Sequence, residues 1–229
     1  MFKQLFDPVS STLTYLIGDA VSKEAVIIDP VEGQSARDLA LLASLGLKLV
    51  CIVDTHVHAD HVTGAAVLKA ATGAVAAVGM ACEAPGYERQ LVGGDRIGFG
   101  NQIIHVIATP GHTPGSLTFQ WRDRLFTGDA LLIGGCGRTD FQNGSADQLY
   151  SSVTGNVFTL PDETLVYPGH DYQGRRVSSV GEEKLLNPRF AGKTREQFIA
   201  LMGALNLPRP KLIDVAVPAN KRAGESHAA

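Results

Sequence analysis

The segment that most constrains this chain is the run DTHVHADH at residues 54–61, which directly follows the apolar stretch LVCIV. A continuous apolar stretch of this length predicts a buried β-strand. In an extended chain, side chains two residues apart point the same way, so His56 and His58 can share one metal ion. Asp60 and His61 come where the chain turns towards a helix, so they face a neighbouring point. Any fold of this chain must therefore place this strand end where a metal site can form.

Three further loops place possible ligands directly after predicted strands. They read TPGHTPGS around His112, FTGD ending at Asp129, and YPGHDY around His170. Proline restricts the backbone and glycine allows tight turns, so a histidine between Pro110 and Pro114 has little conformational freedom, which suits a ligand. Catalytic groups commonly lie on loops that a rigid sheet positions. The four strand ends together predict one metal site of five histidines and two aspartates.

Composition excludes several function classes. The 20 Lys and Arg against 23 Asp and Glu leave a formal charge of −3, which argues against a nucleic-acid or an anionic-membrane partner. No apolar run reaches the ~18 residues of a membrane span, and the N-terminus lacks the pattern of a signal peptide. Three cysteines cannot form a disulfide framework, and an odd number suits a reducing compartment. We therefore expect a cytoplasmic protein.

The remaining histidines and two of the cysteines have simpler interpretations. His105 lies inside an apparent strand and His227 lies in a small, polar tail, so neither is expected in the site. Cys51 is expected in the core. Cys136 is either a reactive thiol or a buried loop residue, and its surroundings favour the buried interpretation.

Apolar patterns along the chain predict a mixed α/β fold. The expected strands are residues 13–17, 25–28, 49–53, 75–78, 97–99, 103–108, 117–121, 125–127 and 165–167. The expected helices are 34–45, a helix from Asp60 or Thr63 to Gly73, 146–153, 178–186 and 194–205. Two successive groups of strands and helices fit a four-layer helix–sheet–sheet–helix sandwich. We expect one domain over residues 1–229, with a short helical, proline-rich segment from about 175 and a frayed tail at 222–229.

The order of these motifs resembles the metallo-β-lactamase superfamily. THVHADH, TPGHTPGS, FTGD and YPGHDY follow one another as they do in that superfamily, and the resemblance runs from about residue 13 to 170. It implies an αββα sandwich with a metal centre on one edge between the sheets. It does not fix the chemistry, because this fold carries hydrolases, oxidoreductases and nucleases.

Four segments resemble one family within the superfamily, the persulfide dioxygenases. They are GCGRTDFQ after Asp129, LLNPR, MGALNLPRP and DVAVPAN, and they extend the resemblance almost to the end of the chain. The family implies oxidation of glutathione persulfide by O₂ and water to sulfite and glutathione, a step in sulfide and persulfide detoxification. It also implies one Fe(II) per chain, because O₂ is activated by one-electron steps that zinc does not provide.

The resemblance implies two ways of using the same ligands. In the superfamily, one ion takes His56, His58 and His112, a second takes Asp60, His61 and His170, and Asp129 bridges them. In the dioxygenases, one iron takes His56, His112 and Asp129, which leaves His58, Asp60, His61 and His170 around these ligands or at a second-metal position. The ligand residues alone leave both arrangements open.

Two residues are candidates for binding the glutathione part of the substrate. Arg138 lies nine residues beyond Asp129 in a glycine-rich loop, where a guanidinium can bind a carboxylate through two parallel hydrogen bonds. The alternative is a structural ion pair with Asp140. Tyr172 lies two residues beyond His170, where its phenol can hydrogen-bond the peptide backbone of the substrate. Related glutathione thioester hydrolases place a basic residue and a tyrosine at similar points.

Other functions stay open as alternatives. The main one is a two-metal hydrolase of the glyoxalase II type, although the 59 residues after His170 are short for the basic helical domain of those enzymes. A nuclease of this fold is disfavoured by the charge. A purely metal-binding module ranks last because it would leave open coordination positions without a purpose. A homodimer is expected by default for a chain of this class.

Overall fold

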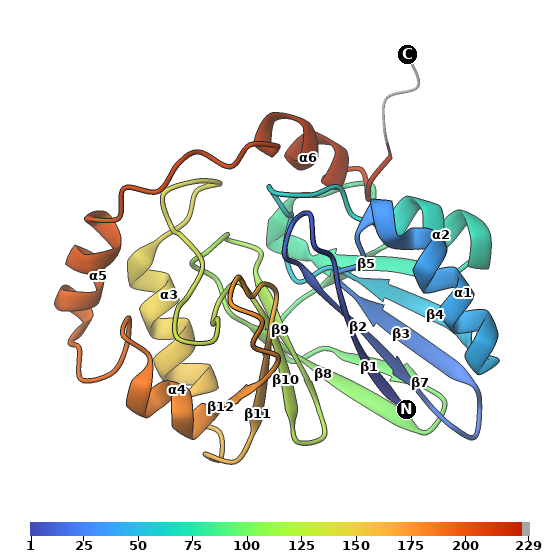
Figure 1. Cartoon of the computed structure of the whole chain (residues 1–229), viewed down its shortest axis with the longest axis horizontal. Helices are drawn as coiled ribbons and strands as arrows, with labels where there is room; N and C mark the ends of the chain where they lie inside the picture. The colour runs from blue at the N-terminus through green and yellow to red at the C-terminus, as the bar shows by residue number, and fades with distance from the viewer. Residues whose placement is uncertain (226–229) are drawn as a thin grey trace.

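The computed structural model describes residues 1–225, which form two β-sheets packed face to face with helices on the outer faces (Figure 1). The first sheet has the order β1-β2-β3-β4-β5-β6. Its first three strands are antiparallel and joined by short turns, whereas β3 to β6 run parallel. Helical crossovers make the parallel pairs possible. The strands are β1 (Phe2–Phe6), β2 (Leu13–Gly18), β3 (Glu24–Ile28), β4 (Lys48–Val53), β5 (Val75–Gly79) and β6 (Arg89–Leu91).

The second sheet has the order β12-β11-β10-β9-β8-β7. Strands β7 to β10 pair as consecutive antiparallel neighbours, and the register of β9 with β10 places a hairpin turn at Arg122 and Asp123. Strand β11 then pairs parallel to β10. The strands are β7 (Arg96–Phe99), β8 (Gln102–Ala108), β9 (Leu117–Trp121), β10 (Arg124–Gly128), β11 (Leu165–Pro168) and β12 (Ser178–Ser179).

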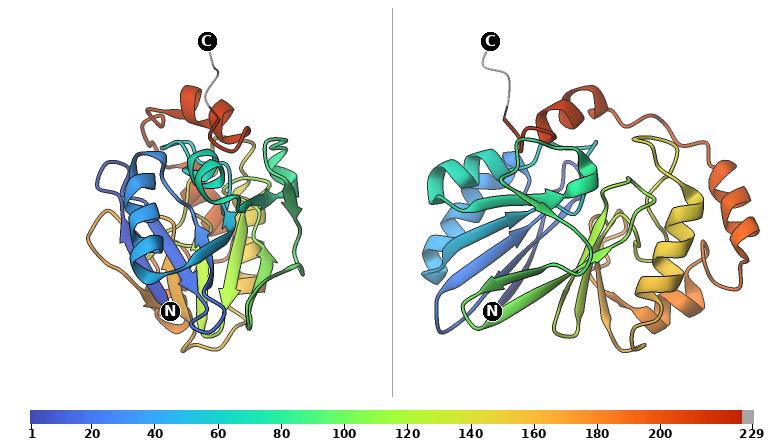
Figure 2. Two further views of the ribbon diagram at one scale, coloured as in Figure 1. Left: turned by 90° about the vertical axis from the view of Figure 1, so that its right-hand side faces the viewer. Right: turned by 180° about the vertical axis from the view of Figure 1, so that it is seen from behind.

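Helices cover the outer face of each sheet, which completes the four layers (Figures 1 and 2). Helices α1 (Ser35–Leu45) and α2 (Ala65–Thr72) lie on the first sheet, and α3 (Ala146–Ser152) and α4 (Val180–Leu186) lie on the second. Helix α5 (Arg195–Gly203) packs on the outer side of α3. Helix α6 (Ile213–Asn220) lies across the edge where both sheets end. The short helical turns are Glu32–Gln34, Met80–Cys82 and Val153–Val157.

Side chains that alternate along the strands build the core between the two sheets. Tyr15, Phe119 and Phe126 are fully buried there, and Phe126 packs against both Tyr15 and Tyr167. A second apolar cluster lies between the first sheet and its helices, and a third lies between the second sheet and its helices. Because both faces of each sheet are covered, the central strands are apolar on both sides. The predicted four-layer architecture is confirmed.

The direction of four strands decides where the site forms. Strand β8 is antiparallel to β9, which is antiparallel to β10, and β10 is parallel to β11, so β8, β10 and β11 end at the same edge. Strand β4 of the first sheet ends at this edge as well (Figure 1). The loops after these four strands carry the histidines and aspartates singled out above.

The structure corrects several predicted details. Helix α2 begins at Ala65 with Gly64 as its N-cap, because Thr63 forms a β-bridge with Val31 and Asp60 stays in the loop. The predicted helix 178–186 opens with β12, and the predicted elements include none of β1, β6 and α6. The tail predicted to fray is packed as far as it is described, since Ala223 is buried.

The remaining sequence predictions concern the helix ends, two histidines and the domain organisation. Gly46 and Gly73 end α1 and α2 in the left-handed conformation, and Gly73 is the predicted helix end. His105 lies exposed in β8, and His227 lies outside the described residues. The expectation of one domain stays a prediction. Among residues 1–225, no helix has the length and apolar character needed to cross a bilayer.

Replacing Phe126 by alanine is expected to destabilise the protein by about 3–5 kcal/mol, because a fully buried ring between the sheets leaves a cavity. The free energy of unfolding is measured by urea denaturation of the metal-free protein. Ile103→Ala is the control, since that side chain is 48% exposed and should cost about 1 kcal/mol or less. Equal losses in the two variants would contradict this account of the core.

Candidate metal centre

Three of the predicted ligands meet at the edge of the sandwich. His56 follows β4, His112 follows β8 and Asp129 follows β10, and one ligand atom from each lies within 4.8 Å of the others. The His112 Nε2 and Asp129 Oδ2 atoms are 3.7 Å apart. Two imidazoles and one carboxylate on one face are a donor set that suits a divalent transition metal and leaves further coordination positions open.

Hydrogen bonds to Nδ1 of His56 and of His112 leave Nε2 of both rings facing the position where the three ligands meet. His112 Nδ1 lies 2.7 Å from the Arg138 carbonyl oxygen, so Nδ1 carries the proton and Nε2 stays free. The Thr55 hydroxyl donates to Asp29, 2.9 Å away, and accepts from His56 Nδ1, also 2.9 Å away. Both imidazoles are thereby set in the tautomer that offers Nε2 as a ligand.

The loop after Asp129 approaches the site so closely that it requires glycine. A Cβ atom at Gly137 would lie 2.7 Å from His112 Nδ1 and 2.6 Å from the Asp129 carbonyl oxygen. Gly137 N also donates to that carbonyl oxygen. The close approach lets the next residue present its carbonyl to His112, so the glycine-rich loop orients a ligand through its backbone.

His170 lies between two carboxylates. Its Nδ1 is 2.7 Å from Asp129 Oδ1, and its Nε2 is 2.9 Å from Asp60 Oδ2. Burial opposes a charge on His170, but both carboxylates favour the imidazolium and hold the pKa of His170 well above its ordinary value. Burial likewise opposes ionisation of Asp129, yet His170 and the two other nearby imidazoles hold the pKa of Asp129 far below its usual range. His170 therefore orients both carboxylates.

The other predicted residues form an adjoining group of His58, Asp60 and His61, whose ligand atoms also lie within 4.8 Å of one another. His61 Nδ1 is 3.1 Å from Asp60 Oδ2. Within the described chain, the buried atoms His58 Nδ1 and His61 Nε2 have no hydrogen-bond partner. An unpartnered buried nitrogen is costly, so both atoms fit the neighbourhood of a cation. All seven predicted residues thus lie in one region.

Two buried carboxylates behind the site are missing from the sequence prediction. Asp29 Oδ1 lies 3.2 Å from His58 Nε2 and accepts from the Thr55 backbone N–H, and Asp54 accepts from Tyr87 at 2.5 Å. Burial alone would lower the pKa of His58, but Asp29 and Asp54 raise it to about 9. Burial raises the pKa of Asp54 to about 6, against the opposing effect of His58. Both aspartates directly follow apolar strands, which is the signal that could have identified them.

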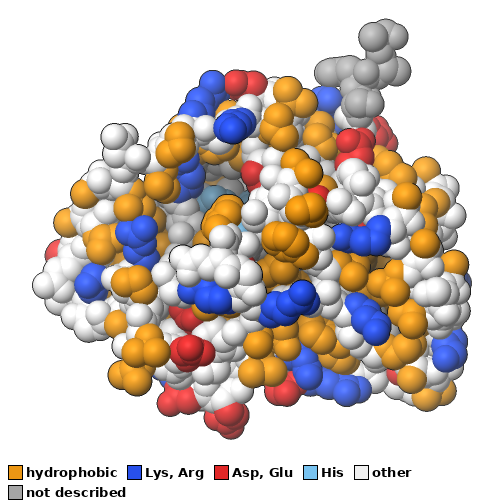
Figure 3. Space-filling view, viewed as in Figure 1, with side chains coloured by type: hydrophobic (Ala, Val, Ile, Leu, Met, Phe, Trp, Pro, Cys, Tyr) orange, Lys and Arg blue, Asp and Glu red, His pale blue; other side chains and the backbone are white. Residues whose placement is uncertain are grey.

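A cavity of about 430 Å³ opens onto the metal centre. This volume lies within the range of about 300–1,000 Å³ typical of small-molecule sites. The space-filling view shows the hollow with histidine at its base (Figure 3). The wall opposite the ligands is apolar and includes Leu132, Cys136, Phe141, Leu207 and Pro208.

The two predicted substrate-binding residues both line this cavity. The Arg138 guanidinium forms a bidentate ion pair with Asp140, with both N–O distances at 2.6 Å. It also donates to the carbonyls of Leu207 and Pro208. The structural ion pair considered for Arg138 is therefore present at the cavity wall. The Tyr172 ring stacks on His170 with centroids 6.1 Å apart.

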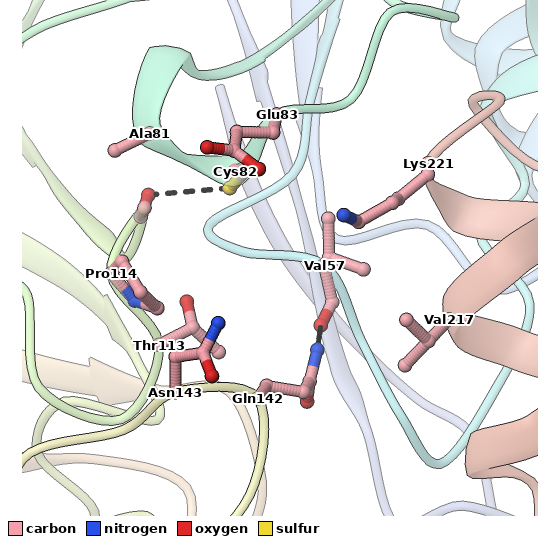
Figure 4. Close-up of a pocket in the computed structure, with 11 residues that line it drawn as sticks. Val57, Ala81, Cys82, Glu83, Thr113, Pro114, Gln142, Asn143, Val217 and Lys221 are labelled. Carbon is pink, nitrogen blue, oxygen red and sulfur yellow. Dashed lines mark hydrogen bonds between the residues drawn. The ribbon is translucent and has the colours of Figure 1, made fainter.

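A smaller cavity of about 190 Å³ lies on the other side of Gln142, which lines both cavities (Figure 4). Gln142 Nε2 donates at 2.8 Å to the carbonyl oxygen of Val57, which lies between His56 and His58. Val217 and Lys221, from α6 and the residue after it, line the opposite wall. The loop at residues 56–63 is therefore contacted by side chains from distant parts of the chain.

Burial governs the chemistry of the three cysteines. Cys51 lies in the core, as predicted, and burial raises its pKa to about 11. Burial raises the pKa of both Cys82 and Cys136 to about 12. Cys136 is half-buried, and its Sγ lies 3.7 Å from the Met202 sulfur. These values favour the neutral thiol at all three positions.

Comparison with known proteins gives matches over most of the chain. Residues 7–170 match the family described as the metallo-beta-lactamase superfamily. The chain is 50% identical over 226 residues to the persulfide dioxygenase ETHE1, mitochondrial, of Homo sapiens, and the match covers 98% of this chain and 89% of the human protein. It is 38% identical over 168 residues to a hydroxyacylglutathione hydrolase of Rhodospirillum rubrum, covering 72% of this chain and 64% of that protein.

Solved structures match the whole fold as well. The crystal structure of ETHE1 from Myxococcus xanthus superimposes with a TM-score of 0.97 at 56% sequence identity, covering 98% of this chain and 100% of that one. At this similarity the arrangement of strands and loops is shared throughout, including the segments after His170.

Native protein at pH 8 is expected to react with iodoacetamide more than about 100-fold slower than urea-unfolded protein, because burial suppresses the thiolates. The measurement is the time course of alkylation at each cysteine by mass spectrometry. Rapid labelling of Cys136 in the native protein would show a reactive thiol in the cavity wall.

Proposed function

The chain belongs to the persulfide dioxygenase family of the metallo-beta-lactamase superfamily, and from this membership we propose that it oxidises glutathione persulfide. One persulfide, one O₂ and one water yield one glutathione, one sulfite and two protons. The outer sulfur is oxidised and O₂ is reduced, while the sulfur–sulfur bond breaks. The near-complete coverage of the human relative supports this assignment.

The observation that carries the proposal is the convergence of His56, His112 and Asp129 at the base of the cavity. These three residues would hold one Fe(II), which supplies the one-electron chemistry needed to activate O₂. The hydrogen bonds that His56 and His112 donate to the Thr55 hydroxyl and the Arg138 carbonyl leave Nε2 of both imidazoles free for a metal. The donor set therefore fits a ferrous ion.

The hydrogen bonds of His170 support one metal ion per chain. Its Nε2, which a second ion would need, lies 2.9 Å from Asp60, and the same carboxylate oxygen faces His61. His170 in this arrangement orients Asp129 through its other nitrogen. His58, Asp60, His61 and His170 then act as positioning residues for the three ligands.

The remaining cavity residues bind substrate and exclude water. The apolar wall at Leu132, Phe141 and Leu207 shields the persulfide sulfur from water. Such shielding suits this reaction, in which water is needed only to release sulfite. Arg138 lines the cavity, and its guanidinium binds a glutathione carboxylate by exchanging its present partner Asp140 for the substrate. The exposed phenol of Tyr172 hydrogen-bonds the peptide part of the substrate.

A two-metal thioester hydrolase is the second candidate. The unpartnered His58 Nδ1 and His61 Nε2 favour it, because the two-ion arrangement uses both histidines as ligands. The identity to a hydroxyacylglutathione hydrolase also favours it, although that match covers 72% of this chain against 98% for the human dioxygenase. The first function is preferred because its family matches the chain beyond His170.

Two earlier expectations stay predictions. A homodimer is expected by default, and the structure contains one chain. A cytoplasmic location is expected from the sequence, whereas the mammalian relatives are described as mitochondrial.

Replacing Asp129 by alanine is expected to remove iron and O₂ uptake together, because it takes the carboxylate from the three-ligand set. Iron per chain is measured on anaerobically purified protein, and O₂ uptake is measured with glutathione persulfide. Asp147→Ala, an exposed aspartate on α3, is the control and should retain both. Iron at the wild-type ratio in the Asp129 variant would show that Asp129 is not a ligand.

Replacing Arg138 by lysine is expected to raise KM for glutathione persulfide about 10-fold or more with little change in kcat, because lysine lacks the planar fork. Asp140→Asn is the matched variant, since it breaks the same ion pair but keeps the guanidinium. It should leave KM unchanged or lower it. An equal loss of kcat in both variants at unchanged KM would assign Arg138 a structural role alone.

A further inference from the structure

The metal-binding loop at residues 56–63 has few backbone partners of its own. It runs from the end of β4 to the start of α2 without regular structure, and much of it is buried. Buried backbone N–H and carbonyl groups outside helices and strands need partners from elsewhere. In this loop, one side chain supplies three of them.

That side chain is Asn220, the last residue of α6. Its Nδ2 donates to the carbonyl oxygens of His58 and His61, at 2.9 and 2.8 Å. Its Oδ1 accepts from the backbone N–H of Thr63 at 2.9 Å. Asn220 is fully buried, so these bonds use both amide protons and one lone pair of a side chain that water does not reach. Asn220 thus fixes both ends of the segment from His58 to Thr63.

The end of α6 is itself held against the first sheet. The Gly86 backbone N–H donates to the Lys221 carbonyl oxygen at 3.1 Å, and Ala223 is buried in the cluster beneath α1 and α2. Gly224 has a φ of +86°, and a Cβ atom there would lie 2.4 Å from the Thr63 carbonyl oxygen. Figure 4 shows Val217 and Lys221 facing Val57 across the smaller cavity. The C-terminal segment therefore packs directly on the metal-binding loop.

We propose that Asn220 is a positioning residue of the metal centre, which sets the loop that carries His56, His58 and His61 in its metal-binding conformation. The carbonyls that it holds belong to two of these histidines, and His56 lies two residues before the first of them. Asn220 belongs to none of the groups of possible metal ligands and does not line the larger cavity. It acts through the backbone, so its removal loosens the loop and weakens metal binding. This inference rests on the proposed function only for the identity of the ion.

Coupling between α6 and the metal follows from this arrangement. If docked α6 favours the metal-binding conformation of the loop, bound metal must favour docked α6 by the same free energy. If Asn220 only stabilised the fold, its removal would lower the free energy of unfolding of the metal-free and the metal-loaded protein equally. The two roles therefore differ in a quantity that can be measured without enzyme turnover.

The first test compares Asn220→Asp and Asn220→Ala with the wild-type protein. Asn220→Asp keeps the acceptor for Thr63 but loses both donors, so two buried carbonyls face a carboxylate. We expect Fe(II) affinity, measured anaerobically by competition with a chelator, to fall about 10–100-fold in both variants. The spectrum of the Co(II)-substituted protein should change as well. Asn156→Asp is the matched control, because that exposed amide donates to the Ala108 carbonyl and lines neither cavity.

The second test needs no substitution and serves if the variants do not fold. Amide hydrogen exchange is measured on the wild-type protein with and without Fe(II). Bound metal is expected to slow exchange in α6 and residues 221–225, in addition to the loop at 56–63. Unchanged exchange in α6, or unchanged metal affinity and Co(II) spectrum in the folded variants, would overturn the proposal.

The proposed function is tested separately by O₂ uptake of the wild-type protein, so failure of one is distinguishable from failure of the other. A wild-type protein that binds metal but consumes no O₂ contradicts the dioxygenase and leaves the affinity comparison intact. A wild-type protein that binds no metal contradicts both.

Discussion

Charge compensation between buried imidazoles and carboxylates is the interaction on which the site depends. His56, His58, His61 and His170 are buried, and Asp29, Asp54 and Asp129 lie among them. None of these carboxylates could stay ionised alone in such surroundings. Each one is therefore held by an imidazole or by hydrogen bonds, as in the contacts of His170 with Asp129 and Asp60. A metal ion adds positive charge to a cluster already arranged to receive it.

The sandwich makes this arrangement possible because strands from both sheets end at one edge. His56 and His58 come from the first sheet, while His112, Asp129 and His170 come from the second. The core between the sheets is built from large apolar side chains such as Tyr15, Phe119 and Phe126, which fix the distance between the two groups of loops. The loops then need little flexibility of their own, since Gly137 and Asn220 hold them from behind.

The sequence predicts which residues belong to this site, but it does not predict most of the contacts between them. The seven histidines and aspartates could be named because each follows an apolar strand, and strand ends gather at a sheet edge. The ion pair of Arg138 with Asp140 could be proposed only as one of two alternatives, because a guanidinium in this loop can pair with a substrate carboxylate as well as with Asp140. Asn220 could not be identified, since its partners lie 157–162 residues away in the chain and its helix contains Pro218. The prediction that the tail frays is wrong for the same reason: packing against distant parts of the chain buries Ala223.

The most direct test of the central claim is the metal content of anaerobically purified protein, measured together with O₂ uptake and sulfite production on glutathione persulfide. We expect about one iron per chain, with one O₂ consumed for each sulfite formed. Two zinc ions per chain, with rapid hydrolysis of a glutathione thioester and no O₂ uptake, would contradict the account.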